Sequence, residues 1–262
     1  MGEPAPDILT HFWSRLQTTS QKVLLLDYDG TLAPFQVDRD RAYPYPGVPE
    51  ILAQIQSSGH TRLIIVSGRS VTDLLPLLGQ EDFPEIWGSH GFERRLEDGT
   101  LHMGKIEPEI LQHLADAYTW VQEHGYGDDC EKKPSSVAFH WRREDENKQQ
   151  ELKKAVRRAW TPLTIDSALE IHPFDGGLEL RYAAFHKGET VKRILAECNS
   201  EAVVAYLGDD LTDEDAFRAL KGRGLSILVR ETYRETLADC WLRPPEDLLA
   251  FLKKWHRLSS KT

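Results

Sequence analysis

The chain has 262 residues, which is enough for one or two domains with a hydrophobic core of their own. It carries 42 acidic and 32 basic side chains, a net charge of −10, and 40% of its residues are apolar. This acidic balance argues against a nucleic-acid partner, and no apolar run approaches the roughly 20 residues that span a membrane. We therefore expect a soluble globular protein without a nucleic-acid or membrane partner.

The cysteines and the N-terminus indicate where the protein works. Cys130, Cys198 and Cys240 are odd in number and form no Cys-x-x-Cys pair, which favours a reducing compartment. The first ten residues have neither the basic nor the apolar region of a secretory signal. These features predict a cytoplasmic protein.

The first hundred residues alternate apolar runs with helical patterns. Residues 23–26 are continuously apolar, as is typical of a strand buried on both faces, and residues 62–66 repeat this pattern. A third strand is expected at 85–91. Helices are expected at 8–17, from Val48 to about Gly59, and after Ser70, which is a plausible N-cap. Strands that alternate with helices predict a parallel sheet.

The pattern changes between about residues 92 and 184. Residues 92–103 contain an Asp-Gly turn between two short runs, which is typical of a hairpin. The following elements are expected to be a helix at 107–125, a strand at 135–142, a helix at 144–160, and strands at 163–174 and 176–184. Long helices between hairpin-like strands indicate an α+β module.

The first pattern returns from His186, with helices expected at 186–199, 212–222 and 246–259 and strands at 202–210 and 225–230. The sequence therefore predicts an α/β fold with a Rossmann-like core, a parallel sheet and helices on both faces. The core would comprise residues 1–105 and 186–262, and an inserted α+β domain would comprise residues 106–185.

Two acidic clusters follow predicted core strands. Asp27 and Asp29 come after residues 23–26, and residues two apart on an extended chain point the same way. Asp209, Asp210 and Asp213 come after residues 203–207. Because the carboxyl ends of parallel strands share one edge of a sheet, the clusters are expected to meet. Buried carboxylates repel one another without a cation, and oxygen ligands suit Mg²⁺, so a magnesium site is predicted.

Two further segments suit a phosphate group. Ser67, Gly68 and Arg69 offer a hydroxyl, backbone N–H groups and a guanidinium at a strand end. Lys187 lies near the start of a helix, where a positive charge opposes the helix dipole unless it has a functional role. Glu214 and Asp215 are interpreted as residues that begin a helix.

These four segments, in this order, resemble the haloacid dehalogenase superfamily of phosphohydrolases. The motif Asp27-Tyr-Asp29-Gly matches its first motif, Ser67 its second, Lys187 its third, and Gly208-Asp209-Asp210 its fourth. The segments LLLDYDGTLAP, VSGR, GSHG, LELR and GDDLTDEDAF also resemble the trehalose-6-phosphate phosphatase family, over about residues 23–220.

The resemblance implies a function and a mechanism in trehalose biosynthesis. The protein would hydrolyse trehalose 6-phosphate, a small sugar phosphate, through an aspartyl-phosphate on Asp27, with Asp29 as general acid and base. Ser67, Gly68, Arg69 and Lys187 would bind the phosphate. Mg²⁺ would be held by Asp27, the backbone carbonyl of Asp29, and either Asp209 or Asp210. Asp213 would orient Lys187 or complete the metal shell.

The inserted domain would act as a cap that recognises the sugar. The resemblance assigns sugar binding to Glu131, Lys133 and Glu179, with His140 and Arg142 beside them and His90 contributed by the core. The C-terminal helix would either cover the core or form a subunit contact, and we expect a monomer.

Three alternatives remain open at this stage. The substrate could be another glucosyl phosphate, such as glucosylglycerol phosphate or sucrose 6-phosphate. A sugar-phosphate mutase would share the aspartyl-phosphate, although the known mutases of the superfamily usually carry a small helical cap. A catalytically inactive sugar-phosphate sensor is opposed by the complete set of motif residues.

Overall fold

The computed structural model describes residues 6–36, 38–79, 84–141, 144–174 and 176–260. The chain divides into two compact units, one made of residues 1–102 and 187–262 and the other of residues 103–186. Arg142, one of the predicted sugar-binding residues, lies outside the described residues. Within the described residues no helix is both long enough and apolar enough to cross a membrane.

The larger unit is built on an eight-stranded sheet with strand order β12-β11-β10-β1-β2-β3-β4-β5. Its strands are β1 (Lys22–Leu26), β2 (Arg62–Val66), β3 (Glu85–Gly88), β4 (Glu93–Arg95), β5 (Leu101–Met103), β10 (Val203–Gly208), β11 (Leu225–Val229) and β12 (Cys240–Leu242). The six strands from β12 to β3 are parallel, and β4 is antiparallel to β3.

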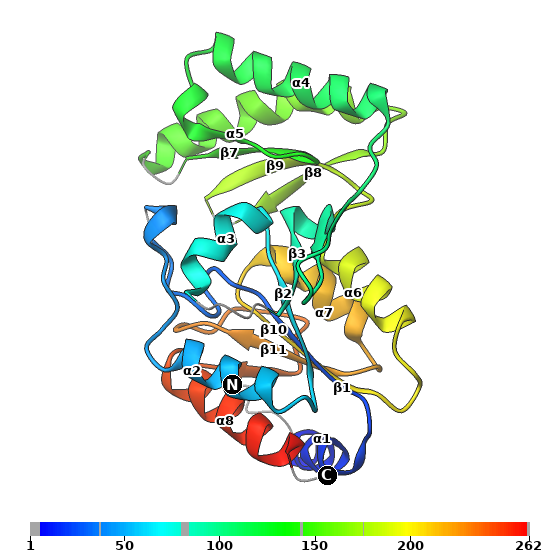
Figure 1. Cartoon of the computed structure of the whole chain (residues 1–262). Coiled ribbons are helices and arrows are strands. Elements are labelled where there is room, and N and C mark those ends of the chain that lie inside the picture. The colour runs from blue at the N-terminus through cyan, green and yellow to red at the C-terminus, as the bar shows by residue number, and fades with distance from the viewer. Residues whose placement is uncertain (1–5, 37, 80–83, 142–143, 175, 261–262) are drawn as a thin grey trace. The chain divides into compact units, whose positions relative to one another are not determined.

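Helices cover both faces of this sheet, because its central strands are apolar on both sides (Figure 1). Leu24 and Leu26 pack into a core with α1 (Pro6–Thr18), α2 (Val48–Ser57), α3 (Val71–Leu78) and α8 (Glu246–Ser259). Val23 and Leu25 face the opposite core with α6 (Lys187–Ala196) and α7 (Glu214–Leu220). This architecture confirms the predicted α/β fold class with a mostly parallel sheet.

The smaller unit has a four-stranded sheet of order β6-β7-β9-β8. Its strands are β6 (Cys130–Lys132), β7 (Ser136–His140), β8 (Leu169–Phe174) and β9 (Gly177–Tyr182), and all the neighbouring pairs are antiparallel. Figure 1 shows α4 (Pro108–Glu123) and α5 (Glu146–Trp160) on one face of this sheet. Val137, Phe139, Leu178 and Leu180 point into the core beneath these helices.

Several sequence expectations about elements need correction. The strand expected at 85–91 ends at Gly88, because Ser89 and His90 adopt φ angles of 47° and 56° and cannot continue an extended chain. The strand expected at 163–174 begins only at Leu169, since Thr161–Thr164 form a 3₁₀ helix. The short strands β6 and β12 were not expected, since three residues carry too little of a period-two pattern to be recognised.

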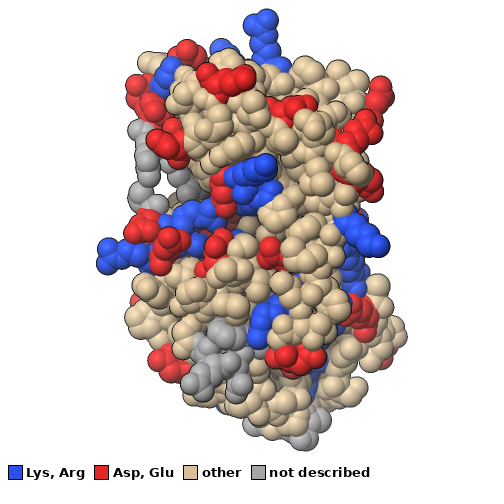
Figure 2. Space-filling view, turned by 45° about the horizontal axis from the view of Figure 1, so that its top comes forward, with Lys and Arg blue, Asp and Glu red and all other residues tan. Residues whose placement is uncertain are grey.

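The surface has the mixed charge that the composition indicates. On the face shown in Figure 2, Asp and Glu side chains are interspersed with Lys and Arg side chains. The three cysteines are free thiols, of which Cys240 is buried.

Candidate active site

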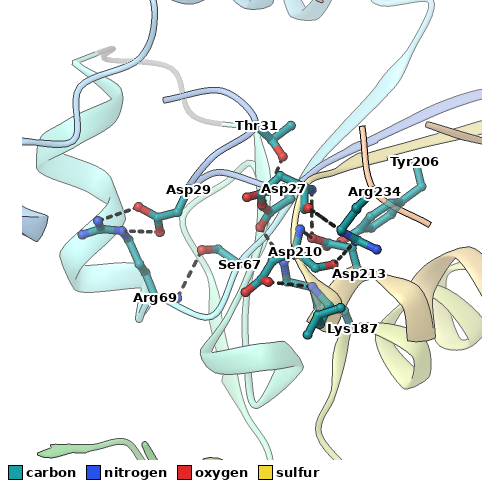
Figure 3. A network of polar contacts seen from close by, with 12 residues as sticks. Asp27, Asp29, Thr31, Ser67, Arg69, Lys187, Tyr206, Asp210, Asp213 and Arg234 are labelled. Atoms are coloured by element: carbon teal, nitrogen blue, oxygen red, sulfur yellow. Dashed lines mark hydrogen bonds and ion pairs between the residues drawn. The ribbon is translucent and has the colours of Figure 1, made fainter. Parts of the chain in front are cut away.

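The candidate site lies where three parallel strands of the larger unit end together. Register pairs Leu26 of β1 with Ile65 of β2 and with Leu207 of β10. Asp27, Ser67 and Asp209 are the first residues after these strands, and Figure 3 shows the polar network around Asp27 and Ser67. The site therefore forms because adjacent parallel strands all run toward the same sheet edge.

The carboxylate of Asp27 is paired with the ammonium of Lys187. Among the described residues, no other cationic side chain forms a hydrogen bond or ion pair with it. Its Nζ atom donates to Oδ1 of Asp27 and to Oδ1 of Asp213, each at 2.7 Å. Burial alone disfavours the charge of Lys187, but the carboxylates of Asp213 and Asp27 raise the pKa of its ammonium. Burial raises the pKa of Asp27 to about 7, against the lowering effect of Lys187. Lys187 is thus a buried cation held by two carboxylates.

Asp213 is fully engaged within the protein. Oδ1 accepts from Lys187 at 2.7 Å and from the hydroxyl of Tyr206 at 2.6 Å. Oδ2 accepts the backbone N–H groups of Asp209 and Asp210, each at 3.0 Å. With four donors on two oxygens, Asp213 orients Lys187 and fixes the loop after β10, and it has little capacity left for a cation.

The carboxylate of Asp209, unlike that of Asp213, is not saturated with hydrogen bonds. Its Oδ1 atom is buried and has no hydrogen-bond partner among the described residues. Burial, followed by the nearby charges of Asp27 and Asp213, raises the pKa of Asp209 well above its usual range. Gly30, at φ +79°, permits this placement, because a Cβ atom there would lie 2.0 Å from Oδ2 of Asp209.

A cation would fit between Asp27 and Asp209. Carboxylate oxygens of Asp27, Asp209 and Asp213 lie within 4.8 Å of one another. Of the three, Asp213 is saturated and Asp209 carries an unpartnered buried oxygen, which a hard cation would satisfy. Asp210 is not among the carboxylates of this cluster, and its Oδ1 atom accepts the N–H of Leu211 at 2.7 Å.

Asp29 and Arg69, both predicted site residues, contact each other. The carboxylate of Asp29 accepts two hydrogen bonds from Arg69, Nε to Oδ2 and Nη2 to Oδ1, both at 2.7 Å (Figure 3). Arg69 is only 2% exposed and its guanidinium lies over the ring of Tyr28. The planar fork of Arg69 matches a carboxylate as well as it would match a phosphate, so the nearby acid binds it here.

Ser67, Gly68 and His90 form a second part of the site. The Oγ atom of Ser67 accepts the N–H of Arg69 at 3.1 Å, and its carbonyl accepts the N–H of His90 at 2.9 Å. A Cβ atom on Gly68 would lie 2.7 Å from the imidazole of His90. The imidazole therefore packs directly against the backbone at the end of β2, where only glycine leaves room.

Arg234 and Glu214 were not recognised as site residues from the sequence. Arg234 follows β11 in a polar stretch without periodicity, and Glu214 has the acidic side chain expected in the first turn of a helix. In the structure the two side chains form an ion pair, and Arg234 also donates to the backbone carbonyl of Asp210 at 2.9 Å. No sequence pattern reports a side chain that contacts a distant backbone.

The smaller unit carries its own polar cluster on the sheet face opposite its helices. Oε1 of Glu179 accepts the hydroxyl of Ser136 at 2.7 Å and lies 3.6 Å from Nζ of Lys133. Oε2 of Glu131 lies 3.9 Å from the same Nζ atom and 3.6 Å from Nε2 of His140. Three strands thus contribute to one group of charged donors and acceptors, a combination that suits hydroxyl groups.

The chain shares its fold with solved haloacid dehalogenase-like proteins. A solved haloacid dehalogenase-like hydrolase from B. subtilis shares the fold with a TM-score of 0.64 and 15% identity, over 89% of this chain and 99% of that one. A closer fold match is the C-terminal domain of trehalose-6-phosphate phosphatase from C. albicans, with a TM-score of 0.81, 21% identity and 98% of each chain covered.

Comparison of the sequence with protein families identifies the family. The Trehalose-phosphatase family profile matches residues 25–240, so the chain belongs to the trehalose-phosphatase family. The trehalose-phosphate phosphatase of Mycobacterium leprae (strain TN) is 32% identical over 267 residues, which cover 94% of this chain and 60% of that protein. The chain spans between 54% and 60% of the length of the mycobacterial relatives that it matches.

Proposed function

We propose that the protein is a Mg²⁺-dependent phosphatase that hydrolyses trehalose 6-phosphate to trehalose and phosphate. The observation that carries this proposal is the buried group of Asp27, Lys187 and Asp209 at the sheet edge of a trehalose-phosphatase family member. A carboxylate, a cation and a vacant ligand oxygen are the groups needed to attack and hold a phosphoryl group.

The first chemical step belongs to Asp27. An oxygen of its carboxylate attacks phosphorus, the bond from phosphorus to the sugar oxygen breaks, and an aspartyl-phosphate forms. Asp29 donates a proton to the departing sugar oxygen. Water then attacks the phosphorus and Asp29 accepts a proton from the water. The bond from phosphorus to the Asp27 oxygen breaks, which frees phosphate and restores the carboxylate of Asp27.

The phosphate oxygens are held by Ser67, by backbone N–H groups at Gly68, and by Lys187, whose buried ammonium is already 2.7 Å from the nucleophile. Arg69 is given a different task from the one predicted from the sequence. Its two hydrogen bonds hold the carboxylate of Asp29, so we propose that it positions the general acid.

Asp27 and Asp209 are the residues that would hold Mg²⁺, with the backbone carbonyl of Asp29 as the third protein ligand implied by the family. The unpartnered Oδ1 atom of Asp209 and the saturation of Asp213 support this choice over Asp210 or Asp213. When bound, the ion supplies positive charge that offsets the repulsion between a carboxylate nucleophile and an anionic substrate.

We assign sugar recognition to residues 106–185, the cap domain. Glu131, Lys133 and Glu179 bind the sugar hydroxyls, and His140, Arg142 and His90 of the core are further candidates for this role. The mutual contacts of the described cap residues support this assignment, because paired acids and bases offer both acceptors and donors. We further propose that the protein acts as a cytoplasmic monomer.

The proposal is tested by phosphate release with and without Mg²⁺ over a small panel: trehalose 6-phosphate, sucrose 6-phosphate, glucosylglycerol phosphate, glucose 6-phosphate and an aryl phosphate. We expect Mg²⁺-dependent release with a strong preference for trehalose 6-phosphate. Preference for another glucosyl phosphate would overturn the cap assignment. If a folded protein that binds Mg²⁺ releases phosphate from no member of the panel, the proposed phosphatase activity is overturned. That result would favour a sugar-phosphate mutase or sensor.

A further inference from the structure

Arg234 contacts the acidic loop after β10 from a segment that lies far along the chain. Its Nη2 atom donates to the carbonyl of Asp210 at 2.9 Å and to the carbonyl of Asp209 at 3.3 Å, and its Nε atom lies 3.4 Å from the same Asp209 oxygen. The side chain of Arg234 is 19% exposed. Figure 3 shows it beside Asp210 and Asp213. One guanidinium thus contacts two successive carbonyls of the loop.

These contacts fix the backbone of Asp209 from its carbonyl side. Its N–H group is fixed from the other side, because it donates to Oδ2 of Asp213 at 3.0 Å. With both flanking peptide groups held, the direction of the Cα–Cβ bond of Asp209 is set, and the carboxylate lies in the space left by Gly30. A ligand whose backbone cannot rotate loses less entropy when it binds an ion.

Glu214 completes this arrangement. It forms an ion pair with Arg234, accepts the hydroxyl of Thr236 at Oε1 at 2.8 Å, and accepts the N–H of Leu237 at Oε2 at 2.8 Å. The negative charge of Glu214 balances the positive charge of Arg234. The guanidinium therefore holds the backbone of Asp209 without offsetting the negative charge of the Asp209 carboxylate, which a cation would bind. The loop of residues 230–239 is thereby tied to the start of α7.

We propose that Arg234 is a positioning residue for the divalent cation, acting through the backbone of Asp209, with Glu214 holding its guanidinium in place. This inference rests on the Mg²⁺ site of the proposed function. It assigns to the loop of residues 230–239 a direct role in how tightly that site binds its ion. Partners that orient metal ligands typically change metal affinity by about 10- to 100-fold when they are removed.

The test is Mg²⁺ binding to the full chain without substrate, measured by isothermal titration calorimetry for the wild type, Arg234→Met and Arg234→Lys. We expect Arg234→Met to raise the Kd for Mg²⁺ at least about tenfold. Arg234→Lys should raise it less than Arg234→Met, because an ammonium can still donate to one carbonyl, although it cannot contact both in the same fork. If Arg234→Met does not fold, the lysine variant decides the question by its Kd alone.

Asp239→Asn is the matched control. Asp239 anchors the other end of the same loop, since its Oδ2 atom accepts the N–H and the hydroxyl of Ser226 at 2.9 and 2.7 Å. The substitution Asp239→Asn should lower the melting temperature of the protein and leave the Kd for Mg²⁺ unchanged. Unchanged Mg²⁺ affinity in a folded Arg234 variant, or an equal loss in Asp239→Asn, would overturn the inference.

The activity assay separates this inference from the proposed function. A wild-type protein that binds Mg²⁺ but releases no phosphate from trehalose 6-phosphate would overturn the proposed function, while the comparison of variants would still decide the role of Arg234. A wild-type protein that binds no Mg²⁺ would overturn both.

Discussion

The ammonium of Lys187 lies 2.7 Å from Oδ1 of Asp27, although the two residues are 160 positions apart, and each side chain is only 4% exposed. Asp27 follows the first strand of the core, and Lys187 begins the first helix after the smaller unit. The contact therefore joins the two chain segments that flank residues 103–186, and Asp27 is paired with Lys187 only when both segments have folded together.

Replacing Lys187 by methionine should destabilise the fold as well as abolish activity. Asp27 and Asp213 would both lose their buried cation, and breaking a buried ion pair from one side typically costs about 3–5 kcal/mol. The free energy of unfolding, measured in urea with EDTA present, should fall by that amount. A loss below about 1 kcal/mol would contradict the assignment of Lys187 as their counter-ion.

Lys192→Met is the control for that experiment. Lys192 pairs with Glu189 on the same helix, but its side chain is 60% exposed. An exposed pair contributes little, so the free energy of unfolding should change by no more than about 0.5 kcal/mol.

The stability of the metal-free protein should depend on pH through Asp27. Burial raises the pKa of this carboxyl from 3.8 to about 7 in the folded state. Between these values the folded state binds the extra proton, so this group makes the wild type lose stability as pH rises through the window. Asp27→Asn does not titrate. Its stability relative to the wild type should therefore increase by about 1–4 kcal/mol between pH 4 and 8.

Urea unfolding of both proteins in EDTA at several pH values measures this difference. The use of a difference removes the titration of groups that do not interact with Asp27, such as Glu197, whose pKa is lowered by Arg94 and Arg62 against the effect of burial. A difference that stays constant from pH 4 to 8 would contradict a perturbed Asp27.

Asp209→Asn should be more stable than the wild type without metal and should lose the response to Mg²⁺. The wild type buries a carboxylate oxygen without a partner, and removing its charge is expected to add about 1 kcal/mol in EDTA. In thermal melts MgCl₂ should raise the melting temperature of the wild type and of Asp210→Asn, but not of Asp209→Asn. The reverse pattern would assign the ion to Asp210.

Glu179→Gln should affect the sugar and leave the phosphate chemistry intact. Glu179 accepts the hydroxyl of Ser136 and lies 3.6 Å from Lys133. Loss of a hydrogen bond to a charged acceptor costs about 1.5–3 kcal/mol, so the KM for trehalose 6-phosphate should rise at least about tenfold. Hydrolysis of an aryl phosphate should be unchanged.

Glu170→Gln serves as the matched control for Glu179→Gln. Glu170 lies on β8 of the same sheet and pairs with Arg181, with 45% of its side chain exposed. The substitution Glu170→Gln should leave the hydrolysis of trehalose 6-phosphate and of the aryl phosphate unchanged. A rise in the KM for trehalose 6-phosphate equal to that of Glu179→Gln would indicate a general disturbance of the sheet.

The sequence was informative where the fold obeys a simple geometric rule. Continuous apolar runs at 23–26 and 62–66 predicted buried parallel strands, and the carboxyl ends of such strands share an edge. That rule alone was enough to expect Asp27, Ser67 and Asp209 near one another.

The rest depended on contacts that no periodicity encodes. The buried fork of Arg69 binds the carboxylate of Asp29, a contact between residues 40 positions apart that the sequence pattern does not indicate. Arg234 acts on backbone carbonyls, which every residue has, so its sequence context carries no signal. The distinction between Asp209 and Asp210 required knowing which carboxylate the local N–H groups satisfy.

The most direct test of the central claim is to trap the phosphorylated enzyme. The protein is mixed with trehalose 6-phosphate and Mg²⁺, quenched within one turnover, treated with borohydride, and digested for mass spectrometry. An acyl phosphate on Asp27 would be reduced to homoserine, so we predict homoserine at position 27 and none in a control without substrate. Release of phosphate without homoserine at position 27, or with the modification at another aspartate, would contradict the account.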